Sequence, residues 1–478
     1  MNNLTRVQIT ALGNEGQGVG DLPSGKKVFV PAVLPGEVCD IQITDETTNY
    51  AEGICVDLVT PSPNRILSYG NFVPGADLAH MSYESSLEYK EDKVKNCLMR
   101  IGHIPAEVLS FSMKTIVPCD EPLNYRNHMQ YRLVGGKLCL INSITKMAED
   151  PGNPILEYKI FTIIRETLEE VFANAPMNLF EEIVMRGSMR THDILLEFVS
   201  GNTGSHHTVF DNVQKYAEAN NLYYALSTAC QANGFRLSGL TLRISATPED
   251  KRTRGGTRVL LYGSDYYEEL LLGHKFRIHA GAFFQVNIPQ AELIYLAASD
   301  FTKDAASILD LYCGTGSIGL SILRPGQKLT GLETVPEAIR AAKENALLNG
   351  ISNATFSIKP SEKIDFSLLS MPNPMAVVVD PPRKGLSPLL IKKLLEQQPY
   401  KICYISCDPA TLSRDLRMLL ESGIYQMTSV RPYDMFPWTH HVESCVLLER
   451  VSNTRPKAIT LDVEMEDYYR IKGDRTND

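Results

Sequence analysis

Residues 310–319 read Asp-Leu-Tyr-Cys-Gly-Thr-Gly-Ser-Ile-Gly, and this stretch decides the fold of the C-terminal part of the chain. An apolar run precedes it and a helical pattern follows it, so we predict a strand, a glycine turn and a helix. Glycine permits a tight turn and the close approach of a ligand to a helix N-terminus. We therefore expect Gly314 and Gly316 to bind a ligand, with a plain strand–helix turn as the alternative.

A carboxylate at the end of the next predicted strand supports a ligand site. Glu333 ends the run LTGLE, seventeen residues after Gly316. An acid at this position can accept the hydrogen bonds of a ribose diol. Because no third glycine is spaced for a pyrophosphate, the pattern favours adenosylmethionine over a dinucleotide.

Strands and helices continue to alternate around this stretch. We predict strands and helices at 291–301 (helix), 329–333 (strand), 336–350 (helix), 376–380 (strand), 401–407 (strand) and 444–450 (strand). Such alternation is typical of a parallel, doubly wound α/β sheet. We assign it to a Rossmann-like methyltransferase domain over residues 276–450.

The N-terminal patterns predict a different architecture. Short alternating runs between glycine-rich turns indicate a small OB-like β-barrel at 1–62, which ends near the Pro-Ser-Pro at 61–63. Residues 63–275 contain more strands than helices, which predicts a central α+β domain with an antiparallel sheet. The segment 451–478 is a polar tail without periodicity.

Three helices are expected in the central region, at 83–101, 155–173 and 210–231. Ser82 is a plausible N-cap of the first helix, and Gly102 a plausible stop. This first helix is a candidate for packing on the C-terminal domain.

Composition limits the possible classes of protein. The 478 residues are 44% hydrophobic and 22% charged, as in soluble globular proteins. There is no apolar run of about 18 residues that predicts a membrane span, and residues 1–10 lack the apolar core of a secretion signal. Ten cysteines without a Cys-x-x-Cys pair indicate a reduced, cytoplasmic protein. With a net charge of −9, contact with a polyanion must use local patches, such as Lys251, Arg252, Arg254 and Arg258.

Two further strand ends carry reactive side chains. Asp380 is followed by Pro-Pro-Arg-Lys-Gly at 381–385, and a carboxylate with two cations in one loop suits recognition of a nucleotide or base. Cys407 ends the run KICYISC. A free cysteine is most often a small buried residue, but this position at the same sheet edge as Asp380 favours a thiol that faces a ligand.

Residues 434–444 contain the single tryptophan, two adjacent histidines and Glu443. Adjacent residues of a strand point to opposite faces, so His440 and His441 argue against a metal site. Glu443 is an ordinary solvated strand entry unless it faces Cys407.

Taken together, these four segments resemble the RNA uracil-C5 methyltransferase family in order and spacing. The family has an adenosylmethionine motif, an Asp-Pro-Pro-Arg loop, a nucleophile segment and a base segment. Residues 283–287, FFQVN, match a further family segment, and residues 16–20 with 29–37 resemble a TRAM domain, an OB-like RNA-binding barrel. The resemblance spans residues 5–450 and is closest to the branch that methylates 23S ribosomal RNA.

The resemblance implies roles for individual residues. Cys407 falls on the catalytic nucleophile, Glu443 on the general base and Phe283 on a substrate-binding ring. The positions that contact adenosylmethionine are Gln285, Tyr312, Ser317, Glu333 and Asp380, in addition to the glycine turn. The family usually has asparagine after the nucleophile, whereas this chain has Asp408.

Many family members hold a [4Fe–4S] cluster through four cysteines. Aligned on residues 80–83, the corresponding positions of this chain are Leu67, Val73, Ala76 and Asn153. Cluster ligation requires thiolates. We therefore predict S-adenosyl-L-methionine as the cofactor, with no iron–sulfur cluster and no metal.

The chemistry of uracil methylation needs a thiolate and a carboxylate in one site. Thiolate addition at C6 makes C5 nucleophilic toward the methyl group, and a base then removes the C5 proton. We expect an enzyme of EC class 2.1.1 that acts on RNA, 23S rRNA in preference to the tRNA T-loop, without a membrane or an obligate protein partner.

Two other functions are considered. A non-catalytic RNA-binding protein would have no reason to retain both Cys407 and Glu443. Methylation of an exocyclic amine would require an aromatic residue after the two prolines, where this chain has Arg383.

Overall fold

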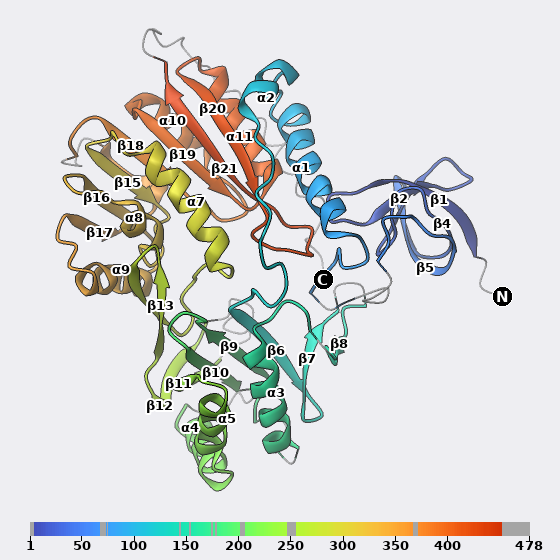
Figure 1. The fold of residues 1–478 in the computed structure, drawn as a ribbon, viewed down its shortest axis with the longest axis vertical. Helices are drawn as coiled ribbons and strands as arrows, with labels where there is room; N and C mark the ends of the chain where they lie inside the picture. The colour runs from blue at the N-terminus through green and yellow to red at the C-terminus, as the bar shows by residue number, and fades with distance from the viewer. Residues whose placement is uncertain are drawn as a thin grey trace.

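The computed structural model describes residues 4–66, 73, 75–142, 145–152, 154–173, 175–176, 179–200, 206–245, 255–366 and 371–451. A barrel, a central sheet and a larger sheet covered by helices follow one another along the chain (Figure 1). Lys251, Arg252 and Arg254 of the predicted basic patch lie outside the described residues, as does the tail 452–478. No helix in the described ranges is long and apolar enough to cross a membrane.

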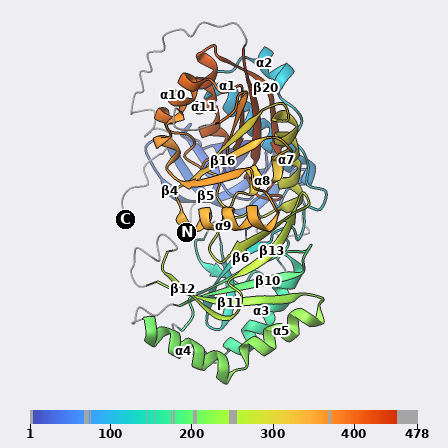
Figure 2. The same ribbon diagram turned by 90° about the vertical axis from the view of Figure 1, so that its left-hand side faces the viewer.

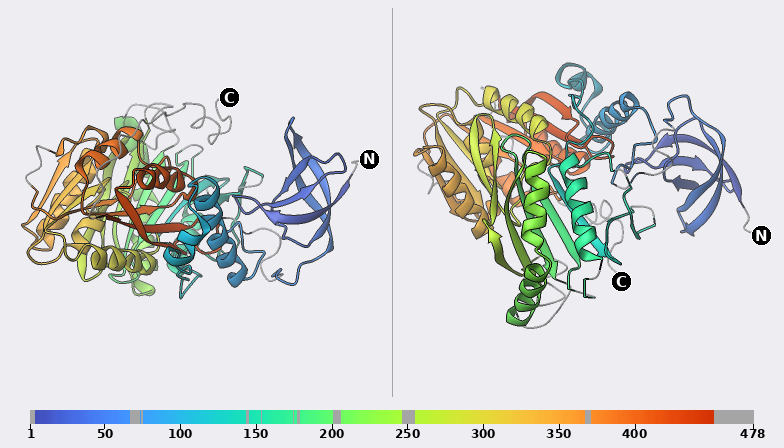
Figure 3. Two further views of the ribbon diagram at one scale, coloured as in Figure 1. Left: turned by 90° about the horizontal axis from the view of Figure 1, so that it is seen from above. Right: turned by 60° about the horizontal axis from the view of Figure 1, so that its bottom comes forward.

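The N-terminal barrel is closed, with the strand order β1-β2-β3-β5-β4. Its strands are β1 (Thr5–Leu12), β2 (Gly18–Asp21), β3 (Lys27–Val30), β4 (Val38–Glu46) and β5 (Tyr50–Thr60). Alternate residues such as Val7, Ile9, Val28 and Val30 point inward and are buried, as the period of two requires. Figure 3 shows the barrel at one end of the molecule. The predicted barrel is confirmed.

The segment between β5 and α1, residues 61–82, is called the barrel linker. Helix α1 (Tyr83–Arg100) runs from this linker onto the C-terminal domain. Its N-cap is Ser82, whose Oγ accepts a hydrogen bond from Ser85 N at 3.1 Å. Val94 and Leu98 are buried in the core of the larger sheet, next to α11 (Pro409–Glu421) and β20 (Tyr425–Tyr433). A short helix, α2 (Ala106–Ser112), follows.

The central sheet has the strand order β12-β11-β10-β9-β6-β7-β8. The strands are β6 (His128–Val134), β7 (Lys137–Ile141), β8 (Ala148–Glu149), β9 (Glu182–Gly187), β10 (Asp193–Ser200), β11 (Arg236–Ile244) and β12 (Thr257–Gly263). One face is covered by α3 (Lys159–Phe172), α4 (His206–Ala219) and α5 (Leu222–Ala232), of which Figure 2 shows α4 and α5 along the sheet.

Two predictions for this region are wrong in detail. The sheet is mixed rather than antiparallel, because β10 and β11 run parallel and are joined by a crossover through α4 and α5. The helix predicted at 210–231 is two helices, because Asn221 between them has a left-handed φ of 49°. Asparagine adopts this conformation more readily than most residues.

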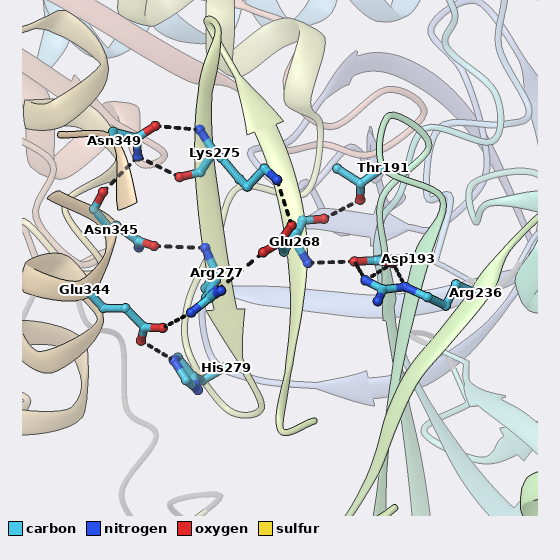
Figure 4. A network of polar contacts seen from close by, with 10 residues as sticks. All are labelled: Thr191, Asp193, Arg236, Glu268, Lys275, Arg277, His279, Glu344, Asn345 and Asn349. Atoms are coloured by element: carbon cyan, nitrogen blue, oxygen red, sulfur yellow. Dashed lines mark hydrogen bonds and ion pairs between the residues drawn. The ribbon is translucent and has the colours of Figure 1, made fainter. Parts of the chain in front are cut away.

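A separate hairpin joins the central sheet to the C-terminal domain, and it consists of β13 (Tyr266–Leu271) and β14 (His274–His279). Its apolar side chains belong to the core of the larger sheet. Its polar side chains form a network (Figure 4). Glu268 N donates to Asp193 Oδ2 at 3.2 Å, and Arg277 pairs with Glu268 at 3.3 Å and with Glu344 at 3.0 Å.

The larger sheet has the strand order β17-β16-β15-β18-β19-β21-β20. Its other strands are β15 (Ser307–Leu311), β16 (Lys328–Glu333), β17 (Ala354–Ile358), β18 (Met375–Val379), β19 (Lys401–Ser406) and β21 (Glu443–Arg450), and its helices include α7 (Ile288–Phe301), α8 (Ser317–Ile322), α9 (Pro336–Leu348) and α10 (Pro388–Gln397). The first five strands in this order are parallel, whereas β21 is antiparallel to both of its neighbours. The predicted doubly wound α/β fold is confirmed.

Candidate active site

The predicted site residues meet at one edge of the larger sheet. Tyr312 directly follows β15, Glu333 ends β16 and Asp380 directly follows β18. Cys407 directly follows β19, and Glu443 opens the antiparallel strand β21. The carboxyl ends of parallel strands form the ligand-binding edge of an open α/β sheet, and β21 runs the other way, so its first residue reaches the same edge.

A buried carboxylate holds the glycine turn. Asp310 Oδ2 accepts a hydrogen bond from Gly319 N at 2.9 Å, and Asp310 Oδ1 is buried without a partner among the described groups. A Cβ on residue 319 would lie 2.7 Å from Asp310 Oδ2, so this approach requires glycine. Gly314 and Gly316 have left-handed φ angles of 52° and 79°. Within the described part of the chain, nothing lies within 4 Å of a Cβ built on Gly314, which leaves the backbone open to a ligand.

Two acids flank the glycine turn. Glu333 Oε2 accepts a hydrogen bond from Gly314 N at 3.3 Å, and its Oε1 accepts one from Val335 N at 3.1 Å. Glu362, in the 3₁₀ helix after β17, accepts a hydrogen bond from Tyr312 OH at 3.0 Å. Glu362 is absent from the sequence-based predictions, because the strand before it, β17, alternates apolar and polar residues and ends four residues earlier.

A buried tyrosine brings the other predicted cofactor residues together. Tyr295 of α7 is 1% exposed, and its OH lies 3.4 Å from Ser317 Oγ. The pKa of Tyr295 is raised overall, mainly by burial. The nearby Asp380 charge adds to the rise, and the hydrogen bonds to Ser317 and Gln285 oppose it. Tyr295 was missed from sequence because α7 has an apolar composition that is typical of a core helix.

Strand pairing places the predicted nucleophile beside the predicted base. In the antiparallel pair β19–β21, Ser406 lies opposite Ser444. The next positions along this register are Cys407 and Glu443. Directly opposed residues of an antiparallel pair have Cβ atoms roughly 5 Å apart and point to the same face.

The surroundings keep the Cys407 thiol protonated. Burial raises its pKa to about 12; the negative charges of Glu443 and Asp380 add to the shift, and Arg383 opposes it. Arg383 Nη2 also donates to His441 Nε2 at 3.2 Å. Arg383 is therefore a cation positioned to favour a thiolate at Cys407.

The carboxyl groups of this edge are also shifted by burial. Burial raises the pKa of Asp380 to about 7 and that of Asp310 to about 8. The pKa of Glu443 is raised well above its usual value, first by burial and then by the Asp380 charge. A bound cation would stabilise the ionised forms of all three acids.

Asp408, which replaces the usual asparagine, caps helix α11. Its Oδ1 accepts a hydrogen bond from Thr411 N at 2.8 Å, and its own N–H donates to Ser406 Oγ at 3.2 Å. Asparagine and aspartate cap helices about equally well. The substitution therefore keeps the cap and adds a negative charge that raises the pKa of Cys407.

The aromatic and histidine side chains near the site have distinct environments. Phe283 is 71% exposed, as a ring that stacks on a base requires, whereas Phe284 is buried. His440 and His441 lie in a bend before β21 and not in a strand, so the expectation that they point to opposite faces is wrong. Their ring centroids are 4.0 Å apart, and His440 Nδ1 lies 2.7 Å from Asp77 Oδ2.

The region that corresponds to an iron–sulfur site contains hydrocarbon side chains. Val73 and Ala76 are buried in a cluster with Ile155, Leu156 and Trp438. The other two positions, Leu67 and Asn153, lie outside the described residues. Neither valine nor alanine can ligate iron, so these residues do not fit a cluster. Among the described residues, no group of three or more His, Cys, Asp or Glu side chains is arranged to hold a metal ion.

Comparison with known proteins identifies the family. The TRAM domain profile matches residues 4–56, and the tRNA (Uracil-5-)-methyltransferase profile matches residues 252–451. An uncharacterized RNA methyltransferase of Clostridium acetobutylicum is 32% identical, with 94% of this chain and 98% of the relative covered. The chain belongs to the RNA uracil-C5 methyltransferase family. A second relative, an uncharacterized RNA methyltransferase of Halalkalibacterium halodurans, is 30% identical, with 94% of this chain and 97% of that protein covered.

A solved structure shows the same fold. It is that of Pyrococcus abyssi tRNA (uracil-54, C5)-methyltransferase in complex with S-adenosyl-L-homocysteine, with a TM-score of 0.70 and 24% identity over 93% of this chain and all of that chain. This likeness shows the fold, whereas the profile and the relatives show that the chain is an adenosylmethionine-dependent RNA methyltransferase of the uracil-5 family. The open glycine turn, the fixed Glu333 carboxylate and the buried acids fit a nucleoside that carries a positive sulfonium.

The first prediction concerns iron. The protein purified without oxygen should contain well below one iron per chain, lack the charge-transfer absorbance of sulfur-ligated iron and keep its activity after chelator treatment, because Val73 and Ala76 offer no thiolate. Elemental analysis and an absorption spectrum measure this. About four irons per chain would contradict it and would mean that the alignment at residues 80–83 is misplaced.

The second prediction concerns the Cys407 thiol. Because its pKa is about 12, alkylation by iodoacetamide should rise about tenfold per pH unit between about pH 7 and pH 9. Mass spectrometry of the Cys407 peptide gives the rate.

Asp408 provides the matched variants for this measurement. Asp408→Asn should keep the cap and speed alkylation, because it removes a charge that raises the pKa. Asp408→Ala should lose about 0.5–2 kcal/mol of stability with the cap. An alkylation rate that does not change with pH would refute the high thiol pKa.

Proposed function

We propose that this enzyme methylates C5 of a uracil in RNA through Cys407 as the nucleophile and Glu443 as the base. The observation that supports this most directly is the register of β19 and β21, whose last pair, Ser406 and Ser444, directly adjoins the two residues. On the basis of the family resemblance we assign Gln285, Tyr312, Gly314, Gly316, Ser317, Glu333 and Asp380 to the cofactor and Phe283 to the target base.

Each proton and electron pair of the reaction can be followed. Bound adenosylmethionine supplies an electrophilic methyl group on a positive sulfonium. Cys407 loses its proton to water, and the thiolate forms a bond to C6 while the electron pair of the C5–C6 double bond moves to C5. C5 then takes the methyl group as the bond between that group and the sulfonium breaks, and the electron pair of the broken bond stays on sulfur. Glu443 accepts the C5 proton, the C–H pair restores the C5–C6 double bond and the thiolate leaves.

Burial and charge suit the two residues to these steps. The thiolate is rare at neutral pH, so the positive Arg383 beside it favours the attacking form. A carboxylate with a raised pKa is a stronger base toward a carbon-bound proton once it is ionised. The exposed ring of Phe283 offers a stacking surface for a base that has left its own stack.

We propose 23S ribosomal RNA as the substrate. The support is the resemblance to that branch of the family. The alternative is transfer RNA, the substrate of the similarly folded Pyrococcus abyssi enzyme. Mapping 5-methyluridine in both RNAs from a strain without this gene decides between them: loss from rRNA supports the proposal, and loss from tRNA alone refutes it.

The third prediction tests the nucleophile. Cys407→Ala should abolish methyl transfer, because no thiolate can then activate C5. It should leave binding of S-adenosylhomocysteine nearly unchanged, since the thiol acts on the uracil. Isothermal calorimetry and transfer of a labelled methyl group measure the two effects. Methylation by this variant at a rate near that of wild type would rule out the mechanism.

The fourth prediction tests the base. Glu443→Gln should form the covalent protein–RNA adduct and then stall, because the C5 proton cannot be removed. The adduct should appear as a slowly migrating band on a denaturing gel. Normal turnover without such a band would exclude Glu443 as the base.

A further inference from the structure

The loop directly before the proposed base, Glu443, is held by parts of the chain that lie outside the larger sheet. This base loop, residues 434–442, connects β20 to β21 and ends directly before Glu443, the first residue of β21. Lys90 of α1 forms a fully buried ion pair with Asp434 and donates to Phe436 O at 2.9 Å. Tyr83 OH donates to Asp434 Oδ2 at 2.7 Å. Helix α1 thus fixes the beginning of the base loop.

The barrel linker fixes the middle of the base loop. Leu78 N donates to Trp438 O at 2.9 Å, and Asp77 pairs with His440 at 2.7 Å. The Trp438 ring is 5% exposed and packs with Val73 in the apolar cluster of the linker. The linker and the base loop are therefore one packed unit.

The barrel itself reaches the same place through the turn between β1 and β2, residues 13–17. Tyr89 OH lies 2.8 Å from Gly13 O. Gly16 has a left-handed φ of 79°, and a Cβ on it would lie 2.5 Å from Leu78 Cδ2 and 3.5 Å from His440 Cβ. The barrel turn thus packs directly on the linker and on the base loop.

One side chain connects the barrel turn with the base loop. Lys93 Nζ donates to Asn14 O in the turn at 2.6 Å and to His440 O in the base loop at 2.9 Å. His440 lies three residues before Glu443. Glu443 also pairs with Tyr433 at the end of β20, and Cys407 directly follows β19, next to the Asp408 cap of α11. The base loop therefore adds to the strand pairing that places Glu443.

We propose that Lys93 is a positioning residue that couples the TRAM barrel to the catalytic base. By joining Asn14 O to His440 O, it holds the base loop, and with it Glu443, in a fixed place relative to the barrel that contacts RNA. This inference rests on the proposed function and predicts that Lys93 affects proton removal more than thiolate addition.

The test separates these two steps with two RNA probes. One probe carries uridine, and the other carries 5-fluorouridine, in which fluorine replaces the proton that the base removes. Adduct formation on the fluorinated RNA reports thiolate addition and methyl transfer, whereas turnover on uridine RNA also needs the base. Lys93→Met removes the ammonium group that makes both hydrogen bonds and keeps an aliphatic side chain. Lys93→Arg restores a donor, and Lys95→Met, exposed on the same helix, is the control.

Lys93→Met should slow turnover on uridine RNA by about tenfold or more, since misplacing a group by 1 Å can cost about a hundredfold. A covalent adduct should accumulate on that RNA, as with Glu443→Gln, while the rate on fluorinated RNA stays near that of wild type. Lys93→Arg should recover turnover, and Lys95→Met should match wild type. Wild-type turnover by Lys93→Met, or an equal loss on both probes, overturns the inference.

A second pair of variants keeps the inference testable if Lys93→Met does not fold. Gly16→Ala places a Cβ 2.5 Å from Leu78 Cδ2 and so disturbs the packing of the barrel turn on the linker that holds the base loop. Gly25→Ala has the same left-handed backbone, with a φ of 83°, and open space around it. Gly16→Ala should accumulate adduct on uridine RNA and Gly25→Ala should not; equal behaviour overturns the inference. If wild-type enzyme forms no adduct on fluorinated RNA, the proposed function fails and this inference fails with it.

Discussion

The pairing of Ser406 with Ser444 across β19 and β21 is the constraint on which the proposed chemistry depends. It brings together two positions that are far apart in the chain and points their side chains to one face. A shift of one residue would send one of the two to the opposite face of the sheet. The antiparallel direction of β21 is equally necessary, because it brings the first residue of this strand to the edge where the parallel strands end.

Local sequence determined the parts of the site that a strand end or a turn defines. The glycine turn, Glu333, Asp380 and Cys407 were predicted because each directly follows an apolar run that could only be a buried strand. Tyr295 was missed for the opposite reason. It lies in an apolar helix, and its neighbours Ser317 and Gln285 come from other segments, so nothing within its own helix distinguishes it from a core residue.

Long-range features of the fold were also beyond the sequence patterns. The parallel direction of β10 and β11 depends on how α4 and α5 cross the sheet, and periodicity within a strand carries no information about its neighbour. The break at Asn221 was hidden because apolar residues recur on both sides of it. Asp408 shows the converse case: its side chain keeps the helix cap that an asparagine would also make, and the structure gives no reason for the change to aspartate.

The hairpin of β13 and β14 is attached to helix α9 partly through charges that respond to ionic strength. Its polar side relies on partly exposed charges: Arg277 is about a third exposed, at 32%, and its partner Glu344 is exposed to 34%. Interactions of such charges are weakened by dissolved salt. Its apolar side, with Tyr267 and Phe276, keeps the hairpin attached. Concentrated electrolyte should therefore weaken the polar attachment of the hairpin to α9, while the apolar side keeps the hairpin on the core of the larger sheet.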